Sequence, residues 1–385
     1  MIGPLLLIAV AAAIFVGYNI GGATTAPAFA PAIGANLISK VGAGGLMSAF
    51  FFLGAWTFGR RVVGTLGNDI VHDTGVFTLK TSVVILLFIG FALFAGNLLS
   101  VPASTSMTTV GAIAGLGMAS GELNWTVSGE IVAWWLVTPI IGFGLCAIVG
   151  RYFYPQIERW VEGHRSEGRL VAFVRPGVLP RPSIATVTRD ELLMGGLVVG
   201  IGCLMAFSSG TSNIANVIVP LIGSGELGMN VGILFGSAAV ALGSFTIARR
   251  TLDTLGHEIA DLSLPAAFVV APISAGLVIL LAALGIPASF VVVATLCIAG
   301  IGWGRKTRQQ NNALSGSDRT GPDSFESTGQ PTAGFVTNVR PAAAADEAVF
   351  DPMTTIQVVV LQHAIPALAT LGSYLTFLLI LFFGL

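Results

Sequence analysis

A cluster of hydroxyl side chains lies around Pro102, inside a long stretch of the chain that carries no charge. Its members are small and can form hydrogen bonds: Ser100, Ser104, Thr105, Ser106, Thr108 and Thr109. Proline favours the first turn of a helix, where its missing N–H would have no partner. Ser104, Thr105 and Ser106 should therefore lie in a first helical turn, where free N–H groups and the helix dipole attract anions. The sequence predicts that these three side chains bind an anion; the alternative is that they only pack between helices.

Two other uncharged polar stretches, Asn19–Pro27 and Ser208–Pro220, combine amides, hydroxyls and glycines within apolar runs. This composition is typical of the interrupted helices that form binding sites in transporters. Hydroxyl and N–H groups suit an oxyanion, whereas amide and carbonyl oxygens suit a hard cation such as Na⁺. We expect five more hydroxyls to approach the anion: Thr24, Thr25, Thr211, Ser212 and Ser289. We expect three amides to orient the interrupted helices and to hold a cation: Asn19, Asn213 and Asn216.

The chain that must position these groups has the composition of a membrane protein. Its mean hydropathy is +0.86 over 385 residues, and 10% of the residues are charged, whereas soluble domains contain about 25%. No charge interrupts residues 81–119 or 192–225, and runs of this length predict membrane-spanning helices. The net charge of −1 creates no field that would attract nucleic acid. We expect contact with membrane lipid and a location in the plasma membrane.

The chemistry of the candidate site argues against an enzyme. Its residues do not ionise at ordinary pH, and the chain has no nucleophile elbow, phosphate-binding loop or zinc motif. We therefore expect no catalytic residue, metal centre or organic cofactor. Accumulation of an anion against a negative interior costs about 2.3 kcal/mol per charge per 100 mV, so a driving ion is expected. Na⁺ and H⁺ remain the two alternatives.

Two polar segments divide the chain. Residues 1–150 and 191–303 are predicted to form two membrane repeats. Residues 151–190 form an arginine-rich loop, which the positive-inside rule places in the cytoplasm. Residues 304–353 have the composition of a flexible linker, and residues 354–385 predict a C-terminal membrane helix. The predicted spans within the repeats are Ile2–Tyr18, Gly42–Phe58, Ser82–Gly96, Val101–Met118, Glu130–Tyr152, Glu191–Phe207, Gly228–Ile247, Ala266–Leu284 and Pro287–Trp303.

Similar sequences recur in the two halves in the same order. The stretch Arg60–Asp73, "RRVVGTLGNDIVHD", is similar to Arg249–Leu262, "RRTLDTLGHEIADL". Further along, "SVPAS" at Ser100–Ser104 is similar to "GIPAS" at Gly285–Ser289. A duplicated membrane unit is typical of secondary transporters, whose substrate sites lie at the repeat interface near the midplane. The sequence therefore predicts an all-α polytopic membrane protein of two inverted repeats with broken helices or re-entrant hairpins.

These motifs resemble those of the PiT family of inorganic phosphate transporters, which also includes sulfate permeases. The family's repeated signature is similar to "GYNIGGATTAP" at Gly17–Pro27 and to "GTSNIANVIVP" at Gly210–Pro220, and its hairpin motif is similar to "PASTSM" at Pro102–Met107. The resemblance implies an ion-coupled phosphate permease that works by alternating access; a homodimer is kept open. The signature aspartate is replaced by Ile20 and Asn213, and the hairpin histidine by Met107.

The missing carboxylates bear on the choice of anion. Phosphate carries a proton at neutral pH and benefits from a buried acceptor, whereas sulfate carries none and suits a site made only of donors. The resemblance places phosphate first, and sulfate is the alternative within the same family. A passive anion channel is a third alternative, which would need a continuous polar path.

Overall fold

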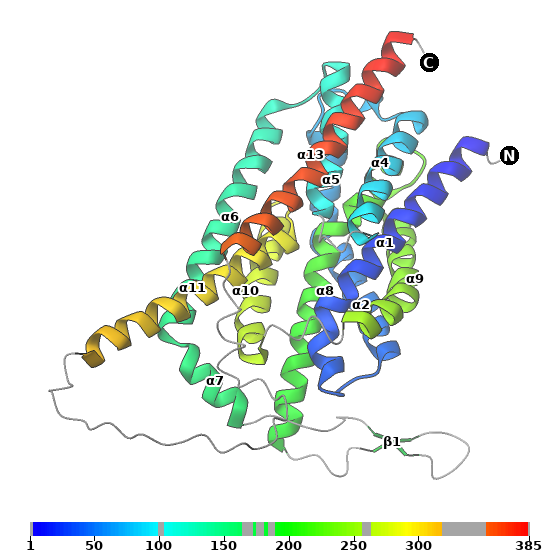
Figure 1. Ribbon diagram of the computed structural model, residues 1–385. Helices are drawn as coiled ribbons and strands as arrows, with labels where there is room; N and C mark the ends of the chain where they lie inside the picture. The colour runs from blue at the N-terminus through cyan, green and yellow to red at the C-terminus, as the bar shows by residue number, and fades with distance from the viewer. Residues whose placement is uncertain are drawn as a thin grey trace, which may run out of the picture.

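The computed structural model describes residues 3–98, 104–163, 172–174, 181–183, 189–255, 263–317 and 352–383. Within these ranges, nine helices are long and apolar enough to cross a membrane. Helices satisfy every backbone hydrogen bond internally, which the bilayer core demands. The predicted all-α polytopic fold is confirmed (Figure 1).

The first half of the chain forms helices joined by short turns. Two single π-helical turns, η1 (Ala55–Gly59) and η2 (Thr65–Asp69), continue the second helix, and a 3₁₀ turn, η3 (Thr74–Val76), follows. The α-helices are α1 (Pro4–Gly34), α2 (Lys40–Gly54), α3 (Arg60–Gly64), α4 (Leu79–Leu98), α5 (Thr105–Ser120) and α6 (Trp125–Tyr152).

A polar segment separates this half from the second. It begins with the short helix α7 (Tyr154–Gly163), whose Trp160 ring packs edge-on against Phe268. Two short antiparallel strands, β1 (Ala172–Val174) and β2 (Arg181–Ser183), follow. The helices of the second half are α8 (Arg189–Gly223), α9 (Met229–Leu255), α10 (Leu264–Ala283), α11 (Phe290–Ser317) and α13 (Pro352–Phe383).

The two halves of the chain are interleaved: helices of the first half pack mainly against helices of the second half. Helix α1 packs against α9 while α2 packs against α8, and α6 packs against α11 while α5 packs against α13 (Figure 1). Glycines permit these close approaches: a Cβ added at Gly21 would collide with the Val240 carbonyl, and one at Gly243 with the Tyr18 carbonyl. Small residues let helix backbones approach in the same way throughout membrane proteins.

One part of the prediction was wrong. The sequence predicts interruptions at Asn19–Pro31 and Ser208–Pro220, but α1 and α8 run through both stretches without a break. The threonine hydroxyls of these stretches bond back to their own helix, as Thr25 does to the Gly21 carbonyl at 2.6 Å, and this arrangement gives a polar side chain a partner inside a continuous helix. A break does occur at the second proline motif, between the end of α10 and the start of α11.

The boundaries of the polar segments also differ from the prediction. The linker was predicted to begin at residue 304, but α11 continues to Ser317. The rest of that predicted linker, residues 318–351, lies outside the described residues. The predicted arginine-rich loop also contains a short helix, α7.

Candidate functional site

The first turn of α5 lies where the sequence predicts it. Ser104 is the N-cap, and its hydroxyl accepts a hydrogen bond from the Met107 N–H at 3.3 Å. Ser104 and Ser106 are fully buried. Pro102 lies outside the described residues. A capped helix start deep in the protein holds backbone donors in the place that an anion would need them.

Helix α8 meets this turn with its own polar side chains. The Thr105 hydroxyl donates to Asn213 Oδ1 at 2.5 Å, and Ser106 Oγ lies 2.9 Å from Ser212 Oγ. These pairs join residues more than one hundred positions apart in the sequence. The structure therefore brings together two of the predicted polar stretches, one from each half of the chain.

The turn between α10 and α11 contributes a third group, the backbone carbonyl of Ala288. Ser106 Oγ donates to this carbonyl at 2.9 Å, and Ser212 Oγ donates to it as well. Thr105, Ser106, Ser212, Asn213 and the Ala288 carbonyl are called the hydroxyl cluster below. The next residue, Ser289, is buried and caps α11, because its hydroxyl accepts from the Val292 N–H at 3.4 Å.

Amide groups extend the hydroxyl cluster along α8. Asn216 Nδ2 donates to Asn213 Oδ1 at 3.2 Å, and Asn213 Nδ2 donates to Ser209 Oγ at 2.9 Å. Two buried oxygens of α8 and α5, Asn216 Oδ1 and Thr109 Oγ1, have no hydrogen-bond partner among the described residues. Buried polar atoms normally find partners, so each of these two oxygens is available to a ligand or a water molecule. Neutral oxygens of this kind are ligands for a hard cation.

The predicted contributors on α1 do not join the hydroxyl cluster by a described hydrogen bond. Thr24 and Thr25 donate to carbonyls of their own helix, at 2.7 and 2.6 Å. Thr25 lies one turn after Gly21, whose Cα faces α9, so Thr25 is on the α9 side of the helix. Asn19 is buried and donates to the Phe15 carbonyl at 2.8 Å. Thr211 on α8 likewise bonds within its own helix.

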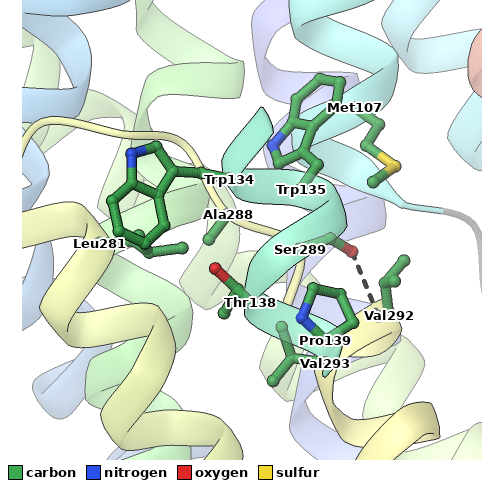
Figure 2. Close-up of a pocket in the computed structure, with 10 residues that line it drawn as sticks. All are labelled: Met107, Trp134, Trp135, Thr138, Pro139, Leu281, Ala288, Ser289, Val292 and Val293. Carbon is green, nitrogen blue, oxygen red and sulfur yellow. Dashed lines mark hydrogen bonds between the residues drawn. The ribbon is translucent and has the colours of Figure 1, made fainter. Parts of the chain in front are cut away.

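A small pocket lies beside the hydroxyl cluster, between α5, α6 and the start of α11. Figure 2 shows Met107, Trp135 and Thr138 around it, together with Ser289. Trp135 Nε1 donates to the Pro287 carbonyl at 2.7 Å. Thr138 is buried, and its hydroxyl has no hydrogen-bond partner among the described residues.

Sequence reasoning missed Trp135 and Thr138. Both belong to an apolar span whose composition is that of an ordinary lipid-facing helix. The sequence feature that could have indicated them is Pro139, which follows Thr138 directly. This proline removes a backbone N–H in the middle of α6. Proline in a membrane helix requires neighbouring groups to satisfy the freed carbonyl.

Comparison with known proteins identifies the family. A model of the phosphate transporter family matches residues 20–317. The chain belongs to this family. Members are transporters rather than enzymes, and the spanning helices of this member make it a multi-pass membrane protein.

Individual relatives carry two kinds of name. The sulfate permease CysP of Bacillus subtilis is 30% identical over 298 residues, which cover 77% of each chain. A protein of Helicobacter pylori named as a phosphate permease is 25% identical over 80% of this chain and 70% of its own. A solved sodium-dependent phosphate transporter superposes with a TM-score of 0.65 over 98% of this chain and 100% of its own. Its identity is 18%, so that likeness shows the fold alone.

Proposed function

We propose that this family member is a permease for a tetrahedral inorganic oxyanion, and that the hydroxyl cluster is its binding site. The observation that carries the proposal is the meeting of Ser106, Ser212 and the Ala288–Ser289 turn in one buried place. These groups come from three elements that are far apart in the sequence. Hydroxyl donors and the capped start of α5 suit an oxyanion, because the dipole and free N–H groups of a helix start favour negative charge.

Sulfate is the anion that the site chemistry favours. The side chains of the hydroxyl cluster are hydroxyls and one amide, without a carboxylate. Sulfate has no proton to donate at neutral pH and would be repelled by a buried carboxylate. The 30% identical relative is named a sulfate permease, which supports the same choice.

Phosphate is the second candidate, and one observation favours it. Asn216 Oδ1 is a buried acceptor without a partner among the described residues, and a protonated phosphate oxygen could donate to it. The family name and the phosphate permeases among the relatives support this candidate.

Na⁺ is the coupling ion that the same oxygens favour. Asn216 Oδ1 and Thr109 Oγ1 are neutral, buried and unpaired within the described chain, which fits a hard monovalent cation. No group of the hydroxyl cluster ionises at neutral pH, so a proton has no carrier among those side chains. Bound Na⁺ would offset the charge of the incoming anion. Asn19 on α1 remains the third amide proposed to orient this region.

We propose that the protein works by alternating access, and the packing of helices from one half against helices of the other supports this. The pairs α1–α9 and α2–α8 correspond to each other when the halves are interchanged, as do α6–α11 and α5–α13. Two inverted repeats that rock about the hydroxyl cluster would expose it to each side in turn. The arginine-rich residues 151–190 are proposed to lie in the cytoplasm. A homodimer remains a prediction.

Transport by purified protein in liposomes tests the proposal. We expect radiolabelled sulfate to enter faster than phosphate, to enter faster with an inward Na⁺ gradient, and to exchange when unlabelled anion is preloaded. Preloading accelerates uptake by a carrier but not by a pore, so this arm separates the permease from a passive channel. Phosphate uptake that sulfate neither follows nor inhibits would assign phosphate. The permease hypothesis would be abandoned if neither anion entered or competed.

A further inference from the structure

The donors of the hydroxyl cluster are already occupied by the protein itself. Ser106 and Ser212 both donate to the Ala288 carbonyl, and all three residues are buried. A carbonyl oxygen accepts hydrogen bonds as a sulfate or phosphate oxygen does. An anion that binds these hydroxyls must therefore take the place of the Ala288 carbonyl.

The Ala288 carbonyl belongs to a short connection that is held at both ends. We call the connection Leu284–Ser289 the strap. The Arg61 guanidinium donates to the Ala283 carbonyl just before the strap, and Trp135 Nε1 donates to the Pro287 carbonyl at 2.7 Å within it. Gly285 has a φ of +81°, a left-handed conformation that a glycine adopts without strain. Next to Ala288, the Trp135 bond to Pro287 holds the strap together with the two bonds that Ser106 and Ser212 donate to the Ala288 carbonyl.

Helix α6 carries a second hydrogen-bond donor close to the strap, the Thr138 hydroxyl. Thr138 and Ala288 line the same small pocket, and the Thr138 hydroxyl points into it (Figure 2). That hydroxyl is buried without a partner in the described chain. A buried hydroxyl without a partner costs the fold stability. Its position therefore indicates a second state of the protein in which this hydroxyl donates a hydrogen bond.

We propose that the Ala288 carbonyl is a movable placeholder for the transported anion. Without anion it accepts from Ser106 and Ser212; when the anion takes these donors, the strap turns and the carbonyl accepts from Thr138 instead. Trp135 is a positioning residue, because its bond to Pro287 stabilises the anion-free arrangement. The inference rests on the proposed oxyanion permease and adds two residues, Trp135 and Thr138, that control its affinity without contacting the anion.

Two substitutions should shift anion affinity in opposite directions. Trp135→Phe keeps the ring but removes the donor that stabilises the anion-free strap, so the apparent Kd for sulfate should fall by about threefold to tenfold. Thr138→Val removes the donor of the bound arrangement, so the Kd should rise by a similar factor. Thr138→Ser should restore the wild-type value. Trp134→Phe is the matched control, since Trp134 lines the same cavity and should leave the Kd unchanged.

The measurement is equilibrium binding of radiolabelled sulfate, and of phosphate in parallel, to the purified full chain. Hydrogen–deuterium exchange of the strap amides in anion-free protein is the second readout, and Trp135→Phe should increase it while Trp134→Phe should not. The placeholder is refuted if wild-type protein binds an anion but both variants keep its Kd, or if both variants weaken binding alike. Wild-type protein that binds neither anion refutes the proposed function, and the placeholder with it.

Discussion

The two proline-led helix starts share a tripeptide but contribute different chemistry to the site. Both read Pro-Ala-Ser, at 102–104 and 287–289, and in both the serine caps the helix that follows. After Ser104 come Thr105 and Ser106, which supply hydroxyl donors; after Ser289 come Phe290 and Val291, which supply none. The second start instead presents its backbone, through the Ala288 carbonyl. Two similar helix starts can therefore share a serine cap while only one of them carries the hydroxyls proposed to bind the anion.

The largest effect is expected when the hydroxyl donors to the anion are removed. In the double variant Ser106→Ala with Ser212→Ala, the anion and the Ala288 carbonyl both lose their hydroxyl partners. We expect the affinity for sulfate to fall by roughly 2–3 kcal/mol, because each hydrogen bond to a charged anion is worth about 1–1.5 kcal/mol more than the bond to the neutral Ala288 carbonyl that it replaces. Equilibrium binding of labelled anion to purified protein measures it.

The matched control is Ser120→Ala with Ser274→Ala, whose hydroxyls bond back to their own helices. This control should change the affinity by less than about 0.5 kcal/mol, as substitutions away from special features do. A double variant at Ser106 and Ser212 that retains wild-type affinity would show that the hydroxyl cluster does not bind the anion.

Single substitutions at the first helix start should have intermediate effects. Ser104→Ala removes the cap of α5, and Thr105→Ala removes the partner of Asn213. We expect each to weaken anion binding by roughly 1–2 kcal/mol, measured as the apparent KM of uptake and as Kd. Thr25→Ala on α1 should have a smaller effect, since its hydroxyl bonds within its own helix. A larger loss of affinity in Thr25→Ala than in Ser104→Ala and Thr105→Ala would indicate that the anion binds next to α1 instead.

The second helix start should tolerate loss of its hydroxyl. Ser289→Ala removes the cap of α11, which typically costs about 0.5–1 kcal/mol of stability. We expect a small decrease in thermal stability and less than a threefold change in anion Kd, since the carbonyl of Ala288 remains. An affinity loss as large as that of Ser104→Ala would mean that both starts bind the anion equally.

Much of the site could be predicted from the sequence, because the relevant signals are local. Proline followed by hydroxyls indicates a capped helix start, and the structure places Ser104 as that cap. The polar stretches of α1 and α8 misled because glycine, proline and threonine are compatible with both a broken and a continuous membrane helix. In the structure α1 is continuous, and its threonine hydroxyls donate to carbonyls of the same helix. Trp135 and Thr138 were missed because Pro139 marks the region of α6 but does not say which neighbouring side chains face a pocket rather than lipid.

The amino-acid composition of each segment is enough to establish that the chain crosses the membrane several times and that the polar stretches of its candidate site carry no charge. Hydrophobicity and side-chain chemistry are properties of each segment alone, so no packing is needed to recognise them. Helix packing, in contrast, determines that Ser106 meets Ser212 and the Ala288 carbonyl, while Thr24 and Thr25 stay bonded to α1. That choice depends on how glycine-lined helices of the two halves pack across each other, and the direction in which a side chain points is fixed only when its helix is packed.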